Sequence, residues 1–295
     1  MIVPLWIVFA LLTVASRAVS KPYQKYLLED FEESELLVVR DSVALIFFIP
    51  TVLYLLCTSG FSGTAESTAA MLGSGFLNLI GAFVVFASLN RGDASLVVPI
   101  MSFSPVVTAL IEPFLREAVI PPTVIFGGVL CSVGAVITSS KGNSVRNLFE
   151  ESDKVAIILA VSANFIFGLT SILDAISTSV INPFISSSVI VLFVWSGSLL
   201  RMVYFGSKNS DERKSRLLRM LRRDKGILGI LQFVGLSLTF LTFSTSPSAA
   251  QASVLFKLSI VFVVIFGYLK LDEGYFVRRL LGAVMISVGS SLAVI

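Results

Sequence analysis

Long apolar runs alternate with short polar stretches from one end of the chain to the other. Runs of about 18 to 22 residues can cross the roughly 30 Å hydrocarbon core of a bilayer as helices. None of them alternates apolar and polar residues with a period of two, so membrane β-strands are disfavoured. The pattern predicts ten membrane-spanning helices, at Ile2–Ser20, Leu36–Leu56, Ala70–Leu89, Ala94–Leu115, Pro121–Ser140, Lys154–Ile176, Ser186–Phe205, Gly226–Phe243, Ala249–Leu269 and Arg278–Ile295.

The composition agrees with this division. The 295 residues are 55% hydrophobic and 14% charged, whereas about 25% of the residues of a soluble domain are charged. The first run has no basic leader, and Arg17 stands where small residues would mark a cleavage site, so we expect a helix and not a signal peptide. The sequence therefore predicts an all-α, multi-pass integral membrane protein, with the plasma membrane as its expected location.

The basic residues gather on one side of the predicted membrane. With each loop numbered by the helix that it follows, odd loops and their flanks hold 20 of the 22 Lys and Arg residues, and the exceptions are Arg116 and Lys257. Such asymmetry in short loops marks the cytoplasmic side. We therefore expect the odd loops in the cytoplasm and both termini outside.

The seventh loop, from Lys208 to Lys225, is the most basic segment. Leu217, Leu218 and Leu221 recur at helical spacing among its cations. This pattern is typical of a short amphipathic helix on anionic inner-leaflet lipid, and a simple charge cluster that fixes the topology is the alternative. A nucleic-acid patch is disfavoured, and we expect no nucleic-acid partner.

A repeat divides the chain into two five-helix units. Gly127 and Gly134 in the fifth helix have the spacing of Gly282 and Gly289 in the tenth, and the stretch 92–108 lines up with 247–263 at the same offset. We expect one unit at residues 1–140, a linker at 141–153 and a second unit at 154–295. An odd number of helices in each unit places the second upside down relative to the first. Inverted repeats are typical of secondary transporters whose site lies near the midplane, although a duplicated channel or scaffold remains an alternative.

Several segments resemble a known family. They are the RDSVAL stretch at Arg40–Leu45, SPVVTALIEPFLRE at Ser104–Glu117, GGVLCSVGAVI at Gly127–Ile137, and LDEGYFVRRLLGAVMISVGSSL at Leu271–Leu292. Together they resemble EamA-like members of the drug/metabolite transporter superfamily. The resemblance implies ten helices in two inverted repeats and the transport of small molecules. The chain departs from the family pattern where Arg116 and Asp272 replace the usual Gly before Glu.

Lys257 is the most informative polar residue. It lies about eight residues into the ninth predicted helix, too deep for its ammonium to reach the interface comfortably. An ionisable group at this depth costs at least about 2.5 kcal/mol, so it should face a wet cavity or a partner. One interpretation is a structural pair with backbone carbonyls or with Glu112. The other is a fixed positive charge that binds a carboxylate or phosphate of a substrate.

Other polar residues in the predicted helices are softer candidates. With Lys257, the predicted substrate-binding set comprises Ser102, Asn78, Asn164, Gln232, Gln251 and Ser253. Ser104, Thr108 and Ser162 have the same character. Each could instead form a hydrogen bond between helices.

The sequence offers little for catalysis. It contains no His, only two Cys, and no phosphate-binding loop of the GxxxxGK[ST] type. We therefore expect no catalytic residues, no cofactor and no metal site. The expected function is secondary active transport of a small organic metabolite with an anionic group, with export as the expected direction and alternating access as the mechanism.

Alternatives to this function remain open. A divalent-cation transporter or channel-like member of the superfamily is the main one, and an integral-membrane transferase is less favoured. The expected partners are a small-molecule substrate and the bilayer, while a coupling proton or ion and a homo-oligomer are open additions.

Overall fold

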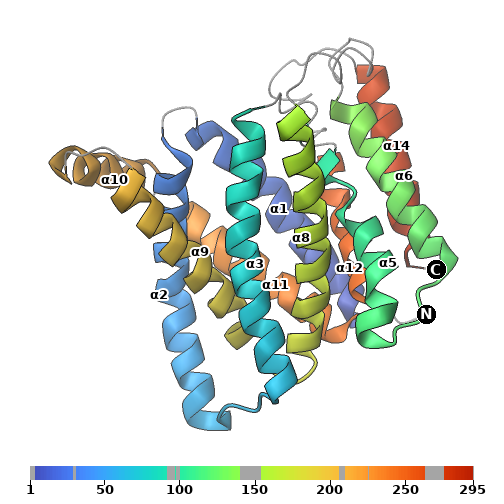
Figure 1. The fold of residues 1–295 in the computed structure, drawn as a ribbon, viewed down its shortest axis with the longest axis horizontal. Helices are drawn as coiled ribbons and strands as arrows, with labels where there is room; N and C mark the ends of the chain where they lie inside the picture. The colour runs from blue at the N-terminus through green and yellow to red at the C-terminus, as the bar shows by residue number, and fades with distance from the viewer. Residues whose placement is uncertain are drawn as a thin grey trace.

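The described part of the chain is helical, with turns between the helices. The computed structural model describes residues 4–28, 31–91, 97, 100–139, 154–205, 210–224, 226–262 and 276–294. In these residues the helices are α1 (Leu5–Leu28), α2 (Glu33–Ser59), α3 (Ala65–Leu89), α5 (Ser104–Arg116), α6 (Pro122–Ser139), α8 (Lys154–Thr178), α9 (Pro183–Phe205), α10 (Ser210–Asp224), α11 (Ile227–Thr245), α12 (Ala249–Phe256) and α14 (Phe276–Leu292). Figure 1 shows them as a bundle from which α10 projects sideways.

Among the described residues, six helices are long and apolar enough to cross a membrane. They are α1, α2, α3, α8, the Pro183–Tyr204 part of α9, and α11. Shorter apolar helices cover Pro122–Thr138, Ala249–Phe262 and Leu280–Leu292. The multi-pass architecture is confirmed, whereas the count of ten spans stays a prediction, because parts of the fourth and ninth segments lie outside the described residues.

The predicted C-terminal end of the first helix is wrong. The run was expected to end at Ser20, but α1 continues to Leu28, with Pro22 inside the helix. Polar residues at 17, 21 and 24 made the apolar run look shorter than the helix. Because these side chains lie on the bundle side or at the helix end, they do not stop the helix.

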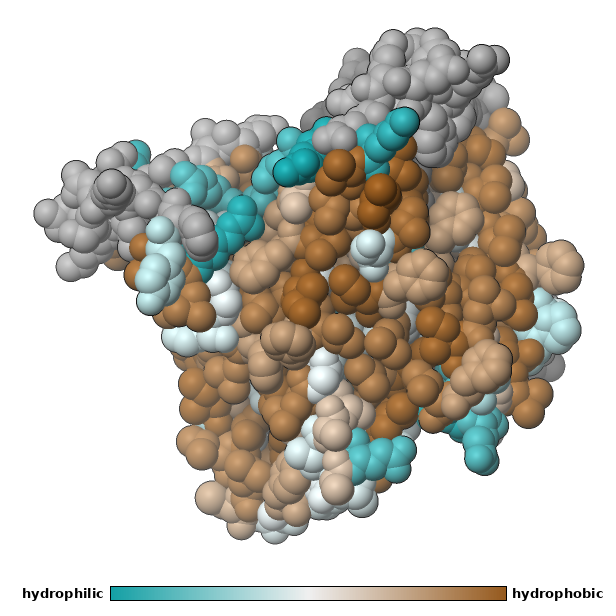
Figure 2. Space-filling view, in the orientation of Figure 1, coloured by the Kyte–Doolittle hydropathy of each residue, from teal (hydrophilic) through white to brown (hydrophobic). Residues whose placement is uncertain are grey.

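The side of the bundle in Figure 2 is largely hydrophobic. Hydrophobic residues cover most of this lateral surface, and hydrophilic ones gather at its upper edge and at a few places near its lower end. Large apolar side chains are exposed along the helices, such as Ile46 at 67%, Tyr54 at 68% and Phe126 at 71%. Such a surface suits hydrocarbon, because lipid tails solvate apolar side chains as well as a protein core does.

The helices pack in pairs that fit a two-repeat layout. In one cross-unit pair α3 packs with α8, and in the corresponding pair α11 packs with α1. Each joins the third helix of one predicted unit to the first helix of the other. The second helices, α2 and α9, pack together, as do the last ones, α6 and α14. A pseudo-two-fold axis produces this reciprocal pairing.

The contact between α6 and α14 shows the same reciprocity residue by residue. A Cβ added at Gly127 would lie less than 3.0 Å from the carbonyl oxygen of Gly289, and the reverse is also true. Gly134 and Gly282 approach each other in the same way. Small residues let the two helix backbones meet.

The fourth and ninth segments, expected as continuous helices, are interrupted. A turn at Ser102 and Phe103 precedes α5, and a turn at Lys257 ends α12 before helical backbone resumes at 258–262. At Lys257 the backbone hydrogen bonding changes from the α-helical to the 3₁₀ pattern, because its N–H donates to the carbonyl of Val254, three residues earlier, at 3.0 Å. Pro105 near the start of α5 has no N–H to extend a helix backwards. At the repeat offset Ser102 corresponds to Lys257, so the two interruptions are equivalent.

Candidate functional site

A cavity of about 380 Å³ is lined by helices of both predicted five-helix units. Its walls come from α1, α3, α5, α8, α9, α11 and α12 and from the turns beside α5 and α12. The lining residues are Arg17, Lys21, Asn78, Met101, Ser104, Phe167, Thr170, Ser171, Asp174, Ile190, Leu236, Thr239, Phe240, Phe243, Ser253, Phe256, Lys257, Ser259 and Ile260. Residues from both predicted units therefore share one space.

Three cations line this cavity. Arg17 and Lys21 come from successive turns of α1, and Lys257 comes from the turn after α12. In the described part of the chain no carboxylate oxygen lies within 4.0 Å of any of the three. The cavity is therefore strongly positive where these side chains meet it.

Two of the cations bind hydroxyl groups of the opposite half of the molecule, that is, of the other five-helix unit. The Arg17 guanidinium donates to Thr239 Oγ1 at 3.1 Å, and the Lys257 ammonium donates to Ser104 Oγ at 3.4 Å. Arg17 also lies over the ring of Phe256, with Cζ 4.5 Å from the ring centroid. A hydroxyl and an aromatic ring can solvate a cation without neutralising it. Both cations thus keep charge available to a ligand.

Glu112 does not pair with Lys257, which makes the structural interpretation through that residue wrong. Its two carboxylate oxygens accept from the backbone N–H groups of Ala249 and Ala250, at 2.7 and 2.8 Å, and Arg116 donates to it at 3.1 Å. The carboxylate therefore sits at the positive end of the α12 dipole. It holds the start of α12 against α5 from the opposite half.

A short polar chain on α3 and α8 ends at an acidic group. The amide of Asn78 donates to Ser74 Oγ at 3.1 Å, and Ser74 in turn donates to Asp174 Oδ1. Asp174 lines the cavity, and no Lys or Arg nitrogen of the described residues lies within 4.0 Å of it. Asp174 thus forms an acidic wall of the cavity and makes no ion pair with the three cations.

The predicted site residues divide into two groups. Lys257, Asn78 and Ser253 line the cavity, together with Ser104. The Oγ of Ser253 is buried and has no hydrogen-bond partner among the described groups. An unpaired buried hydroxyl aimed at a polar space is a good candidate to bind a ligand.

The other four predicted residues lie outside the cavity lining. Ser102 Oγ donates to the carbonyl of Ser132 at 3.4 Å, and the Asn164 amide donates to that of Ile100 at 2.6 Å. Gln251 is buried in the first turn of α12, and Gln232 is half-buried on α11. The first two fit the alternative in which polar side chains hold membrane helices together.

Sequence reasoning missed Arg17, Lys21 and Asp174. The two cations belong to the flank of the first predicted loop in the charge count, and Asp174 lies near the end of the predicted helix Lys154–Ile176. A usable signal was present, because Trp6, Ala10, Thr13 and Val14 form a buried stripe that continues at helical spacing through residues 17 and 21. With these two removed from the loop count the charge asymmetry still holds, so the predicted orientation stays a prediction.

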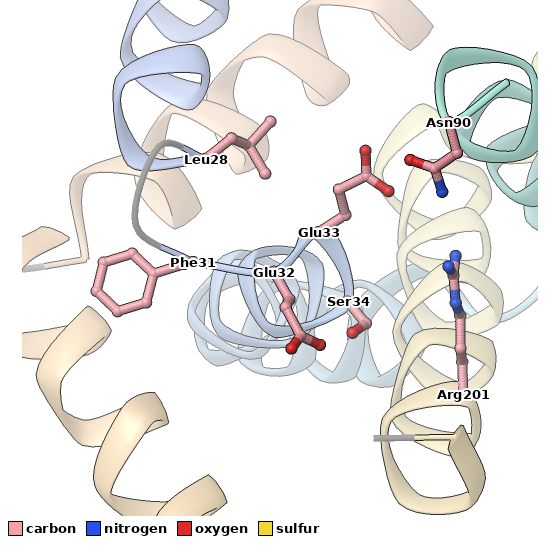
Figure 3. A pocket seen from close by; sticks show the side chains of 7 residues that line it. All are labelled: Leu28, Phe31, Glu32, Glu33, Ser34, Asn90 and Arg201. Atoms are coloured by element: carbon pink, nitrogen blue, oxygen red, sulfur yellow. The ribbon is translucent and has the colours of Figure 1, made fainter. Parts of the chain in front are cut away.

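A second cavity of about 400 Å³ lies at one end of the bundle. Figure 3 shows Glu33, Asn90 and Arg201 turned toward one another beside the junction of α1 and α2. Its lining shares no residue with the central cavity. Among the described residues, no group of three or more His, Cys, Asp or Glu side chains could hold a metal ion.

The paired helices, the lipid-compatible surface and the apolar spans define a multi-pass integral membrane protein. The chain belongs to the EamA-like transporter family, whose model matches residues 4–140 and 154–295. The family resemblance seen in the sequence is thereby confirmed, and members of this family are small-molecule transporters and not enzymes.

Comparison with other proteins adds support for the fold alone. A solved structure titled "Crystal structure of protein" superposes with a TM-score of 0.70 at 13% identity, and the match covers 98% of this chain and 96% of that chain. No curated protein matches the sequence.

Proposed function

We propose that this protein is a secondary active transporter that moves a small organic anion across the plasma membrane by alternating access. The observation that carries the proposal is the set of three cations, Arg17, Lys21 and Lys257, around one cavity between the two halves. Export is the direction expected from the sequence.

The charge balance of the cavity supports an anionic substrate. Uncompensated charge within a membrane protein is costly, and such charge persists where a ligand or water offsets the cost. A carboxylate or phosphate group can accept from Arg17 and Lys257 together, and hydrogen bonds between ionised partners are about twice as strong as neutral ones. The hydroxyl and amide groups of Ser253, Ser104 and Asn78 would orient the rest of the molecule.

The cross-half contacts suggest how binding is coupled to rearrangement. Arg17 and Lys257 each bind a hydroxyl of the opposite half, so a substrate that draws them away would replace two links between the halves. The interruptions before α5 and at Lys257 lie beside the same cavity. Broken helices at a midplane site are typical of transporters in which one repeat rocks against the other.

Asp174 is the candidate group for a coupling proton. It is the one carboxylate that lines the cavity in the described part of the chain. An ionisable residue inside a membrane protein commonly belongs to a proton or ion pathway. A divalent-cation transporter is less well supported, because three cations face the same space and would repel such an ion.

Transport by purified protein in proteoliposomes tests the proposal. The probes are radiolabelled mono- and dicarboxylates and sugar phosphates, measured by counterflow so that no ion gradient is needed. Lys257→Met should reduce the rate by about 10- to 100-fold, the equivalent of one charged hydrogen bond. Lys154→Met is the matched control, because Lys154 is exposed at the start of α8.

Two outcomes would contradict the proposal. If the wild-type protein exchanges none of the anions but exchanges neutral or cationic metabolites, the anion assignment fails. If Lys257→Met inserts, folds and transports at the wild-type rate with unchanged preference, the lysine is structural.

A further inference from the structure

The helix α10 is docked on the bundle through one of its faces. Met220 is fully buried and packs against Leu27, Leu36, Val39 and Leu228, which lie on α1, α2 and α11. Asp224 Oδ1 accepts from the backbone N–H of Leu228 at 3.1 Å, which ties the end of α10 to the first turn of α11. These contacts fix which way α10 faces.

With that face fixed, helical geometry places the others. At 3.6 residues per turn, Leu221 and Leu218 lie about 100° and 160° around the helix from the docked Met220 in one direction, and Arg219 and Arg222 lie about 100° and 160° from it in the other direction. Leu218 is 48% exposed and Leu221 42% exposed, and both arginines are exposed. The helix therefore presents a docked face, an exposed apolar face and an exposed basic face.

The position of α10 matches that of a bilayer surface. Figure 1 shows it beside the first turns of α2, at one end of the bundle. The preceding helix α9 exposes Val203 at 51% and Tyr204 at 77% in its last turn, so the apolar lateral surface continues almost to the start of α10. A helix here can place leucines at the acyl boundary and arginines among headgroups.

We propose that α10 binds the headgroup phosphates of anionic phospholipids through Arg219 and Arg222, while Leu218 and Leu221 enter the acyl boundary. Two observations favour lipid over a soluble anion or a nucleic acid. Exposed leucines stand next to the arginines, and membrane-spanning helices lie beside them. A docked amphipathic helix with this arrangement gains from buried apolar area and from attraction to anionic lipid together. The proposal does not depend on the transported substrate.

Lipid binding by the full-length protein in neutral detergent tests the proposal. The probe is fluorescent phosphatidylglycerol, with phosphatidylcholine carrying the same fluorophore as the zwitterionic comparison. Each cation near a membrane surface changes the affinity roughly fivefold, so Arg219→Gln with Arg222→Gln should weaken phosphatidylglycerol binding about 25-fold. Phosphatidylcholine binding should not change.

Matched variants separate charge, apolar contact and folding. Arg219→Lys with Arg222→Lys keeps both charges and should bind within about twofold of the wild type. Leu218→Ser with Leu221→Ser should weaken phosphatidylglycerol binding although all charges remain. Lys154→Gln, at an exposed cation outside α10, should have no effect. Unchanged thermal unfolding shows that each variant is folded.

The proposal is overturned if the double Gln variant binds phosphatidylglycerol as tightly as the wild type does. It is also overturned if free glycerol phosphate competes at the same concentration as the lipid, which would indicate a soluble phosphate site, or if an oligonucleotide binds more tightly than the lipid. Because no arm uses a transport substrate, failure here leaves the proposed transport function unaffected.

Discussion

The helices α1 and α8 hold equivalent places in the two units but bring opposite charge to the cavity. Each is the first helix of its unit, and each packs on the third helix of the other unit. Yet α1 presents Arg17 and Lys21, whereas α8 presents Asp174. The two units arrange their helices symmetrically, and the side chains make the cavity between them electrically asymmetric.

The same contrast appears at the two interrupted helices. Ser102 and Lys257 occupy equivalent positions, but Ser102 bonds the carbonyl of Ser132 whereas Lys257 faces the cavity. A symmetric cavity would bind a ligand equally in two orientations. With cations on one wall and a carboxylate on another, a ligand is bound in one orientation.

The largest effect on this asymmetry should come from Arg17→Gln. Removing the guanidinium charge should slow anion counterflow about 100-fold, because charged hydrogen bonds contribute roughly 1.5–3 kcal/mol. Thr239→Val removes the hydroxyl that Arg17 binds but keeps the charge of Arg17, so it should slow anion counterflow only a few-fold. Equal losses in the two variants would show that Arg17 acts through helix packing.

The symmetric packing of the two units should be most sensitive to substitution at the glycines between α6 and α14. Gly127→Ala places a methyl group against the carbonyl of Gly289 and should destabilise the protein by about 1–3 kcal/mol, measured by thermal unfolding in detergent. Gly73→Ala is the matched control, since its Cβ would meet one Leu173 methyl carbon at 3.7 Å. If both variants unfold at the wild-type temperature, the two helices do not pack as closely as the structure shows.

Sequence reasoning recovered the helix arrangement better than the site, for a physical reason. Apolar length and the glycine repeat are direct consequences of bilayer thickness and close backbone contact, so both are visible in one sequence. Lys257 was identifiable because it stands alone in an apolar run. Arg17 and Lys21 were not, because a cation near the end of a run looks like a loop flank until the helix is seen to continue to Leu28.

The uncharged polar residues in the helices are easy to find in the sequence, but their roles cannot be told apart there. Asn78 and Asn164 look alike in sequence, each a single amide in an apolar helix. The structure turns Asn78 to the cavity, whereas Asn164 donates to the carbonyl of Ile100. This difference depends on helix rotation and on the turn before α5, neither of which hydropathy reports.

On the acidic wall, Asp174→Asn should remove the effect of a proton gradient on transport. The amide keeps a hydrogen-bonding group beside Ser74 but cannot take up a proton. We expect an inward proton gradient to change the wild-type transport rate about tenfold and to have no effect on the variant, while counterflow without a gradient is kept. Ser74→Ala is the control, and it should stay sensitive to the gradient. A variant that responds to the gradient as the wild type does would exclude Asp174 as the proton site.

The smallest effect should come from Lys21→Gln, and its salt dependence sharpens the comparison within the cationic wall. Lys21 is exposed, whereas Lys257 is partly buried against Ser104. Exposed charges are screened once they lie beyond a Debye length of about 10 Å at 0.1 M salt or 3 Å at 1 M, and buried charges are screened much less. Anion counterflow by Lys21→Gln should therefore be about two- to fivefold slower at low salt and equal to the wild type near 1 M. The defect of Lys257→Met should persist at both concentrations. If the two variants lose their defects together as salt rises, the charge of Lys257 is screened as that of an exposed residue is, and its partial burial does not distinguish it from Lys21.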